Sequence, residues 1–84
     1  MYEMRLTDPN GYTVPGAVRY KVPADQKDAV EAELKGLVEA DAATQRQTYL
    51  DHAEQLTGPS KGNALAAANQ FTATAYEVKA TPVA

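Results

Sequence analysis

The feature that most constrains the fold is a long segment without helix breakers, residues 25–57. It contains no proline and a single glycine, Gly36, and the Ala and Glu residues in its middle favour an uninterrupted helix. Asp25 can accept hydrogen bonds from the free amides of a first helical turn. At the other end, Gly58 suits the left-handed position after a helix and Pro59 cannot continue one. The segment is therefore predicted to form one long helix.

Such a helix is long for a chain of 84 residues. At 1.5 Å per residue it would extend over ~50 Å, whereas a compact domain of this size has a radius of gyration near ~12 Å and a diameter of about 30 Å. A sheet of short strands can cover roughly half of that length. The distal half of the helix is expected to need another packing partner.

The apolar face of this segment also changes direction along its length. Its first half carries a stripe at helical spacing, made of Val30, Leu34, Leu37 and Val38. Beyond residue 40 the same stripe becomes polar, with Asp41, Gln45, Thr48 and His52. The apolar residues of the second half centre roughly 110° away; they are Ala42, Ala43, Tyr49, Leu50, Ala53 and Leu56. Either the chain breaks near residues 39–41 into a helical hairpin, or one helix has two apolar faces.

The remaining sequence predicts strands on both sides of this segment. Residues 2–7 alternate apolar and polar side chains, and Asp8-Pro9-Asn10-Gly11 is a strong turn signal before a second strand over 12–22. Pro15-Gly16 interrupts that strand, as a bulge or as a separate turn. A short helix over 63–71 and a third strand over 72–81 follow. The prediction is a single α+β domain, 1–84, with a small antiparallel β-hairpin and a third strand packed on one long helix in the order ββα(α)β.

Composition limits the size of the core and excludes several classes of protein. Leu, Val and Phe total 14 of 84 residues, with no Ile, so we expect a small core and a modest stability of about 4–12 kcal/mol. The absence of Cys excludes disulfides and thiolate metal sites. No apolar run approaches a membrane span or a signal peptide. The expected location is the cytoplasm or a virus particle.

The sequence also offers little for catalysis. His52 is the only histidine, and Asp51 beside it points about 100° away on a helix, so the two do not form a dyad. One imidazole without a second His or Cys makes a poor metal site. The segment 58–62 resembles a phosphate loop only superficially, because it lacks the required order of residues. We expect no enzymatic activity, no cofactor, no metal and no small-molecule substrate.

Charge is divided unevenly between the long helix and the rest of the chain. Residues 25–57 hold eight acidic and three basic side chains, whereas the remainder holds five basic and three acidic ones. Even-numbered strand positions are predicted to face the helix, which leaves the basic residues on the open face of the sheet: Arg5, Arg19, Lys21 and Lys79. The tyrosines that could stack on bases share the even parity and are expected in the core: Tyr2, Tyr12, Tyr20 and Tyr76. A basic sheet can approach phosphates, but this parity makes nucleic-acid binding the weaker interpretation and docking onto an acidic protein, including the helix of a second copy, the stronger one.

The sequence thus predicts a non-enzymatic protein-protein interaction or assembly subunit, such as a small structural component of a phage virion, with a protein partner or a homo-oligomer. The predicted partner interface is Tyr49, Leu50, Ala53 and Leu56 on the distal helix, with Arg5, Arg19 and Lys21 on the sheet. Intramolecular cover of the distal helix by the short helix is the open alternative. The alternative function is a small regulator or inhibitor that binds a host protein or nucleic acid through the basic face of its sheet.

Overall fold

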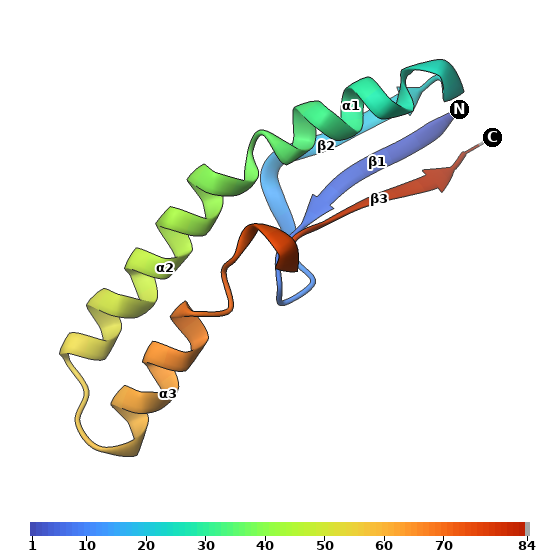
Figure 1. The fold of residues 1–84 in the computed structure, drawn as a ribbon. Helices are drawn as coiled ribbons and strands as arrows, with labels where there is room; N and C mark the ends of the chain where they lie inside the picture. The colour runs from blue at the N-terminus through green and yellow to red at the C-terminus, as the bar shows by residue number, and fades with distance from the viewer. Residues whose placement is uncertain (84) are drawn as a thin grey trace.

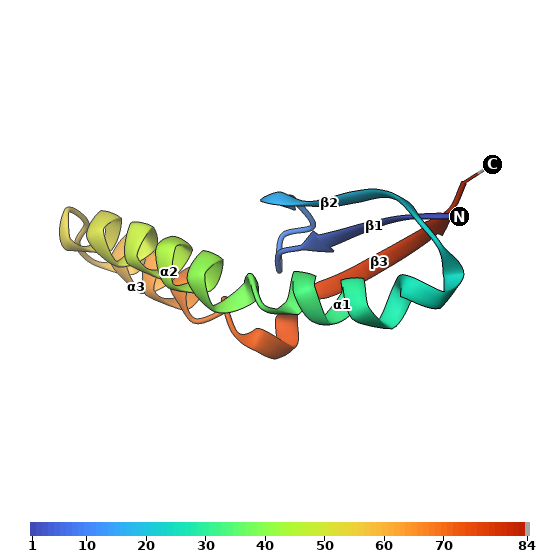
Figure 2. The ribbon, with the colours of Figure 1, turned by 90° about the horizontal axis from the view of Figure 1, so that it is seen from above.

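The computed structural model of the chain describes residues 1–83. The elements are β1 (Tyr2–Thr7), β2 (Thr13–Val22), a 3-10 turn (Ala24–Gln26), α1 (Lys27–Lys35), α2 (Val38–Glu54), α3 (Pro59–Ala68), a second 3-10 turn (Ala73–Ala75) and β3 (Glu77–Pro82). The strands form an antiparallel sheet in the order β2-β1-β3. Helix α1 covers one face of this sheet and the other face is open (Figure 2). The predicted α+β fold, with three antiparallel strands and a long helix in the order ββα(α)β, is confirmed.

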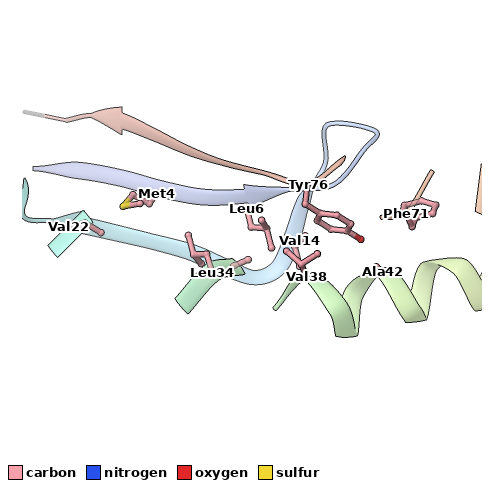
Figure 3. Close-up of a cluster of buried hydrophobic side chains, with 10 residues drawn as sticks. Met4, Leu6, Val14, Val22, Leu34, Val38, Ala42, Phe71 and Tyr76 are labelled. Carbon is pink, nitrogen blue, oxygen red and sulfur yellow. The ribbon is translucent and has the colours of Figure 1, made fainter. Parts of the chain in front are cut away.

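The core lies between the sheet and the first part of the long helix. Leu34 and Val38 are buried, and Val30 and Leu37 pack against them, so the predicted stripe of the first half faces the sheet. Figure 3 shows this cluster. Its buried members come from β1, β2, α1, α2 and the segment between α3 and β3, and Val78 of β3 packs against them. The buried members are Met4, Leu6, Val14, Ala17, Val22, Leu34, Val38, Ala42, Phe71 and Tyr76.

The long helix bends at Gly36–Leu37, between α1 and α2, and continues unbroken past Asp41. The amide of Gly36 donates to the carbonyls of both Ala32 and Glu33, and the amide of Leu37 donates to Leu34, so the turn tightens to 3-10 spacing. A Cβ on Gly36 would lie 3.2 Å from the carbonyl oxygen of Glu33. Glycine at position 36 therefore permits the tightened helical turn. The bend that accompanies the change of apolar face lies at Gly36–Leu37, before the residues 39–41 at which a break was considered.

Strand β2 departs from strict alternation at two irregularities. The register pairs Tyr2 with Val22 but Met4 with Arg19, which inserts an extra residue near Lys21, where φ is +56°. A second shift lies between the pairs Arg5–Val18 and Thr7–Thr13. Each shift changes which residues face the helix. The predicted core position of Tyr20 is wrong for this reason, since its side chain is 71% exposed. The predicted core position of Tyr12 is wrong for a different reason: Tyr12 lies in the turn before β2 begins, and its side chain is 72% exposed.

Two element boundaries also differ from the prediction. Helix α3 begins at Pro59 instead of residue 63, because the fixed φ of proline and its missing N–H suit the first turn of a helix. Strand β3 begins at Glu77 instead of residue 72, since Ala73–Ala75 forms a 3-10 turn. The chain needs this turn to pass from the end of α3 to the sheet.

The molecule is elongated, as the length mismatch predicted. Its dimensions are 50 × 20 × 18 Å and its Cα radius of gyration is 15.5 Å, above the ~12 Å of a compact domain of this length. Helices α2 and α3 project together beyond the end of the sheet (Figure 1). We call this pair, Val38–Ala68, the helical arm.

Candidate protein-interaction surface

The helical arm forms because the chain reverses between two helices at a glycine. Gly58 has φ +64° and ψ −143°, a conformation that is essentially restricted to glycine. Pro59 then starts α3, which runs back alongside α2 (Figure 1). The sequence signals that were predicted to end the long helix therefore also begin the next one.

Small residues and one aromatic pair hold the two helices together. Ala53 of α2 and Ala64 and Ala68 of α3 are buried, and side chains of this size allow close approach of the helix backbones. At the base of the arm, the rings of Tyr49 and Phe71 stack with centroids 5.5 Å apart. The chain after α3 is thereby fixed to α2.

A hydrogen bond reinforces the same attachment. Arg46 Nη1 donates to the carbonyl oxygen of Phe71 at 2.5 Å, and the Phe71 side chain is fully buried. A charged donor on a part-buried carbonyl gives a stronger bond than a neutral pair. The arm is thus anchored where the chain turns toward β3.

One side of the arm exposes two leucines. Leu50 of α2 and Leu65 of α3 are each 39% exposed. Counted at 100° per residue from the buried Ala53 and Ala64, they fall on the same side of the antiparallel pair. We call this the leucine side. It presents branched apolar groups to solvent in the middle of the arm, about two helical turns from the reversal at Gly58.

The opposite side of the arm holds an open groove of about 340 Å³. It is lined by Tyr49, His52, Leu56, Ser60, Asn63, Ala64 and Ala67. His52 itself is exposed, and among residues 1–83 no group of three or more His, Cys, Asp and Glu side chains could hold a metal ion. His52 is therefore one of three polar residues, with Ser60 and Asn63, that line a groove of mixed polar and apolar character.

The structure brings only some of the predicted helical interface residues to the surface. Leu50 is exposed, and Tyr49 and Leu56 are half-buried. Ala53 is 1% exposed and is not accessible to a partner, because α3 packs on α2. The alternative that the short helix covers the distal part of the long helix within the same chain is therefore correct for one face of α2. Leu50 does not belong to the covered face. Leu65 is a further exposed residue that the sequence reasoning missed, although its place among alanines marks it as the one large apolar group of α3.

The predicted basic residues of the sheet do not form one patch. Arg19 is paired with Met4 and so lies on the side covered by α1, where Nε and Nη2 bind Glu33 Oε1 at 2.9 and 2.6 Å. Arg5 does lie on the open face but forms an ion pair with Glu3. Lys21 is exposed at the irregularity of β2. The placement of Arg19 on the open face is wrong because the bulge shifts the parity of β2.

A group of polar side chains lies where the sheet meets the arm, and the sequence reasoning did not identify it as a cluster. Gln45 Nε2 donates to Asp8 Oδ2 at 3.1 Å and to Asp41 Oδ2 at 2.7 Å. The Tyr76 hydroxyl donates to the same Asp41 oxygen at 2.5 Å. We call Asp8, Asp41, Gln45 and Tyr76 the polar junction. The polar stripe that includes Asp41 and Gln45 was the available signal, because polar residues on the continuation of a core-facing stripe need polar partners.

The junction is suited to holding elements together. Burial and the neighbouring Asp41 carboxylate raise the pKa of Tyr76, so its hydroxyl stays a donor at neutral pH. Asp8 is buried and its Oδ1 also accepts the amides of Asn10 and Tyr12 at 2.9 and 3.0 Å. Both carboxylates are occupied by donors that belong to the fold. The cluster thus ties the β1–β2 turn, α2 and the start of β3 together.

Comparison with known proteins found no matching family model, no similar curated protein and no similar solved structure. Within residues 1–83, no helix combines the length and the apolar character that crossing a membrane requires.

Proposed function

We propose that this chain is a non-enzymatic assembly subunit that binds another protein through the leucine side of its helical arm. The observation that carries the proposal is the exposure of Leu50 and Leu65 on a projection that the sheet does not cover. Large apolar groups exposed together on a small domain are typical of a contact site.

The placement of the arm supports a role in binding another protein, in addition to any contribution of the arm to the stability of its own fold. The arm is anchored at its base by the Tyr49–Phe71 stack and by Arg46, while its far end projects into solvent (Figure 1). A rigid projection loses little conformational entropy when it binds. A structural subunit of a larger particle, such as a phage virion, is the kind of protein that this arrangement suits.

The alternative function, binding of a host protein or nucleic acid through a basic sheet, has less support. Arg5 is paired with Glu3, and Arg19 is paired with Glu33 on the other face. Tyr20 is the one tyrosine whose exposure on a strand favours stacking on a base. Few unpaired basic side chains therefore remain on the open face of the sheet, and such side chains are what bind the phosphates of a nucleic acid and release their counterions.

The test is replacement of both exposed leucines, Leu50→Ser with Leu65→Ser, in the full chain. Proteins captured by the tagged wild type are identified by mass spectrometry, produced separately and titrated against each variant. We expect the double variant to keep its circular dichroism spectrum and to raise the Kd at least about tenfold, because losing a centrally placed contact residue costs more than about 1 kcal/mol.

Val83→Ser is the matched control, since Val83 is 37% exposed at the other end of the molecule. This variant should bind like the wild type. An unchanged Kd in the double variant would contradict the proposal. Loss of the folded circular dichroism signal in the double variant would do so as well, because the two leucines would then be core residues.

A further inference from the structure

A second surface, separate from the helical arm, is the outer edge of the sheet at β3. The strand order β2-β1-β3 leaves β3 with one unpaired side, and in Figure 1 no helix or strand within residues 1–83 lies beyond it on the side away from β1. Unpaired edges present backbone donors and acceptors to another chain.

The two edges of the sheet differ in how well they are protected. The edge strand β2 contains Pro15, a positive φ at Gly16 and another at Lys21. Bulges and proline of this kind blunt an edge. In contrast, β3 pairs with β1 over six consecutive residues without a shift. It is therefore straight enough to accept another strand.

The hydrogen bonds identify the backbone groups that face outward. The amide of Val83 donates to the carbonyl oxygen of Met1 at 2.9 Å, so the odd-numbered residues of β3 point their backbone groups toward β1. Hydrogen-bonded pairs alternate along an antiparallel ladder. The N–H and C=O groups of Val78 and Ala80 consequently point away from β1, toward the free edge.

Two charged side chains of β3 lack a partner on their own sheet. Lys79 lies opposite Arg5, and Glu77 lies opposite Thr7. Arg5 is paired with Glu3, and none of the ion pairs among residues 1–83 includes Lys79 or Glu77. Like charges directly opposite each other are unfavourable in a sheet, so Lys79 would be stabilised by an acidic neighbour on its other side.

We propose that β3 pairs antiparallel with β3 of a second copy, about a two-fold axis at Val78. Val78 then exchanges its outward N–H and C=O with Val78 of the partner subunit, and Tyr76 does so with the partner's Ala80. In the same register, Glu77 lies opposite the partner's Lys79 and Lys79 opposite the partner's Glu77. The pairing joins two three-stranded sheets into one.

Other symmetric registers lack these features. Moving the axis to Lys79 places the two lysines opposite each other, which is unfavourable. Moving it to Ala80 pairs Val78 with Pro82, which has no N–H to donate. The register centred on Val78 is the one that supplies outward backbone donors and two pairs of opposite charge together.

The helices leave room for this arrangement. The two copies of β1 would be separated by three strand spacings, or about 14 Å, and α1 packs on the face of the sheet mainly against β1. Helices pack at interaxial distances of about 8–10 Å, so the two copies of α1 do not collide. Because the strands are antiparallel, the two helical arms would project from opposite ends of the joined sheet.

The test uses charge reversal in the full chain and a measurement of mass by light scattering and sedimentation equilibrium. The wild type is expected to approach twice 9.0 kDa as concentration rises into the high micromolar range. Lys79→Glu and Glu77→Lys each replace both attractive pairs with repulsive ones, so each variant alone should dimerise at least about tenfold more weakly.

Mixing tests the register itself. Lys79→Glu carries two acidic residues at the edge and Glu77→Lys carries two basic ones, so an equimolar mixture should form a heterodimer as tight as the wild-type dimer. Lys61→Glu makes the same charge change on exposed α3 and should leave dimerisation unchanged.

A wild type that stays monomeric at all concentrations would overturn the proposal. So would a dimer that is insensitive to the edge variants, or two edge variants that fail to pair when mixed. Each of these outcomes is independent of the proposed function, which depends on Leu50 and Leu65 of the helical arm.

Discussion

At the residue scale, the polar junction shows how two carboxylates can be held where sheet and helix meet. Asp8 accepts bonds from its own turn and from Gln45, and Asp41 accepts bonds from Gln45 and Tyr76. A buried carboxylate without such donors would be costly. The stability of the junction should therefore respond to the loss of a single donor.

Tyr76→Phe removes one donor and keeps the aromatic ring. We expect the free energy of unfolding at pH 7 to fall by about 1–2 kcal/mol, because a hydrogen bond to a charged acceptor is lost while the ring still fills its place in the core. Urea denaturation of both proteins measures the difference. An equal stability would mean that water replaces the hydroxyl without cost.

The stability contributed by the Tyr76–Asp41 hydrogen bond depends on pH in a defined direction. Burial raises the pKa of Tyr76 above its ordinary value, so above about pH 10 the unfolded chain releases this proton before the folded one does. The folded state then binds more protons, and its stability falls as pH rises. The advantage of the wild type over Tyr76→Phe should thus be constant from neutral pH to about pH 9.5 and shrink at higher pH. A difference that grows with pH would contradict this origin.

At the element scale, the reversal between α2 and α3 depends on one glycine. Gly58→Ala should destabilise the protein by about 1–3 kcal/mol, because its φ of +64° with ψ near −143° disfavours any Cβ. Hydrogen exchange should become faster in α3 and remain slow in β1. Uniformly faster exchange would mean that the arm and the sheet unfold as one unit.

Gly62→Ala provides the matched comparison within the same helix. Gly62 lies inside α3, its φ is not positive, and a Cβ there meets no atom within 4 Å. Alanine should therefore raise stability by about 0.5–1 kcal/mol through helix propensity. Thermal unfolding of the two variants should give shifts of opposite sign.

Elements were more predictable than their junctions. The stripe of Val30, Leu34, Leu37 and Val38 identified the face that packs on the sheet, since it depends only on local spacing. The bend at Gly36 was missed because it results from a tightened turn in tertiary context. The outward orientation of Tyr20 was missed because a bulge changes parity without leaving a clear sequence signal.

In the candidate interaction surface, too, features set by local spacing could be predicted and features set by tertiary packing could not. Leu50 could be predicted as exposed, because it lies away from the stripe that the sheet covers. The burial of Ala53 depends on α3 returning along α2, and propensity alone does not specify that return. The free edge at β3 follows from strand order, which the sequence left open.

At the scale of the whole molecule, shape is the property that both proposed contacts require. If the arm folded back over the open face of the sheet, Leu50 would be buried and the radius of gyration would approach ~12 Å. Small-angle X-ray scattering on Lys79→Glu, which is expected to be monomeric, should instead give a radius near 15.5 Å and a maximum dimension near 50 Å. The wild type at high concentration should be longer than this, because a two-fold pairing at β3 places the arms at opposite ends. A compact scattering profile for Lys79→Glu would contradict the exposed helical arm. A wild type whose maximum dimension does not exceed that of the variant would contradict the pairing at β3.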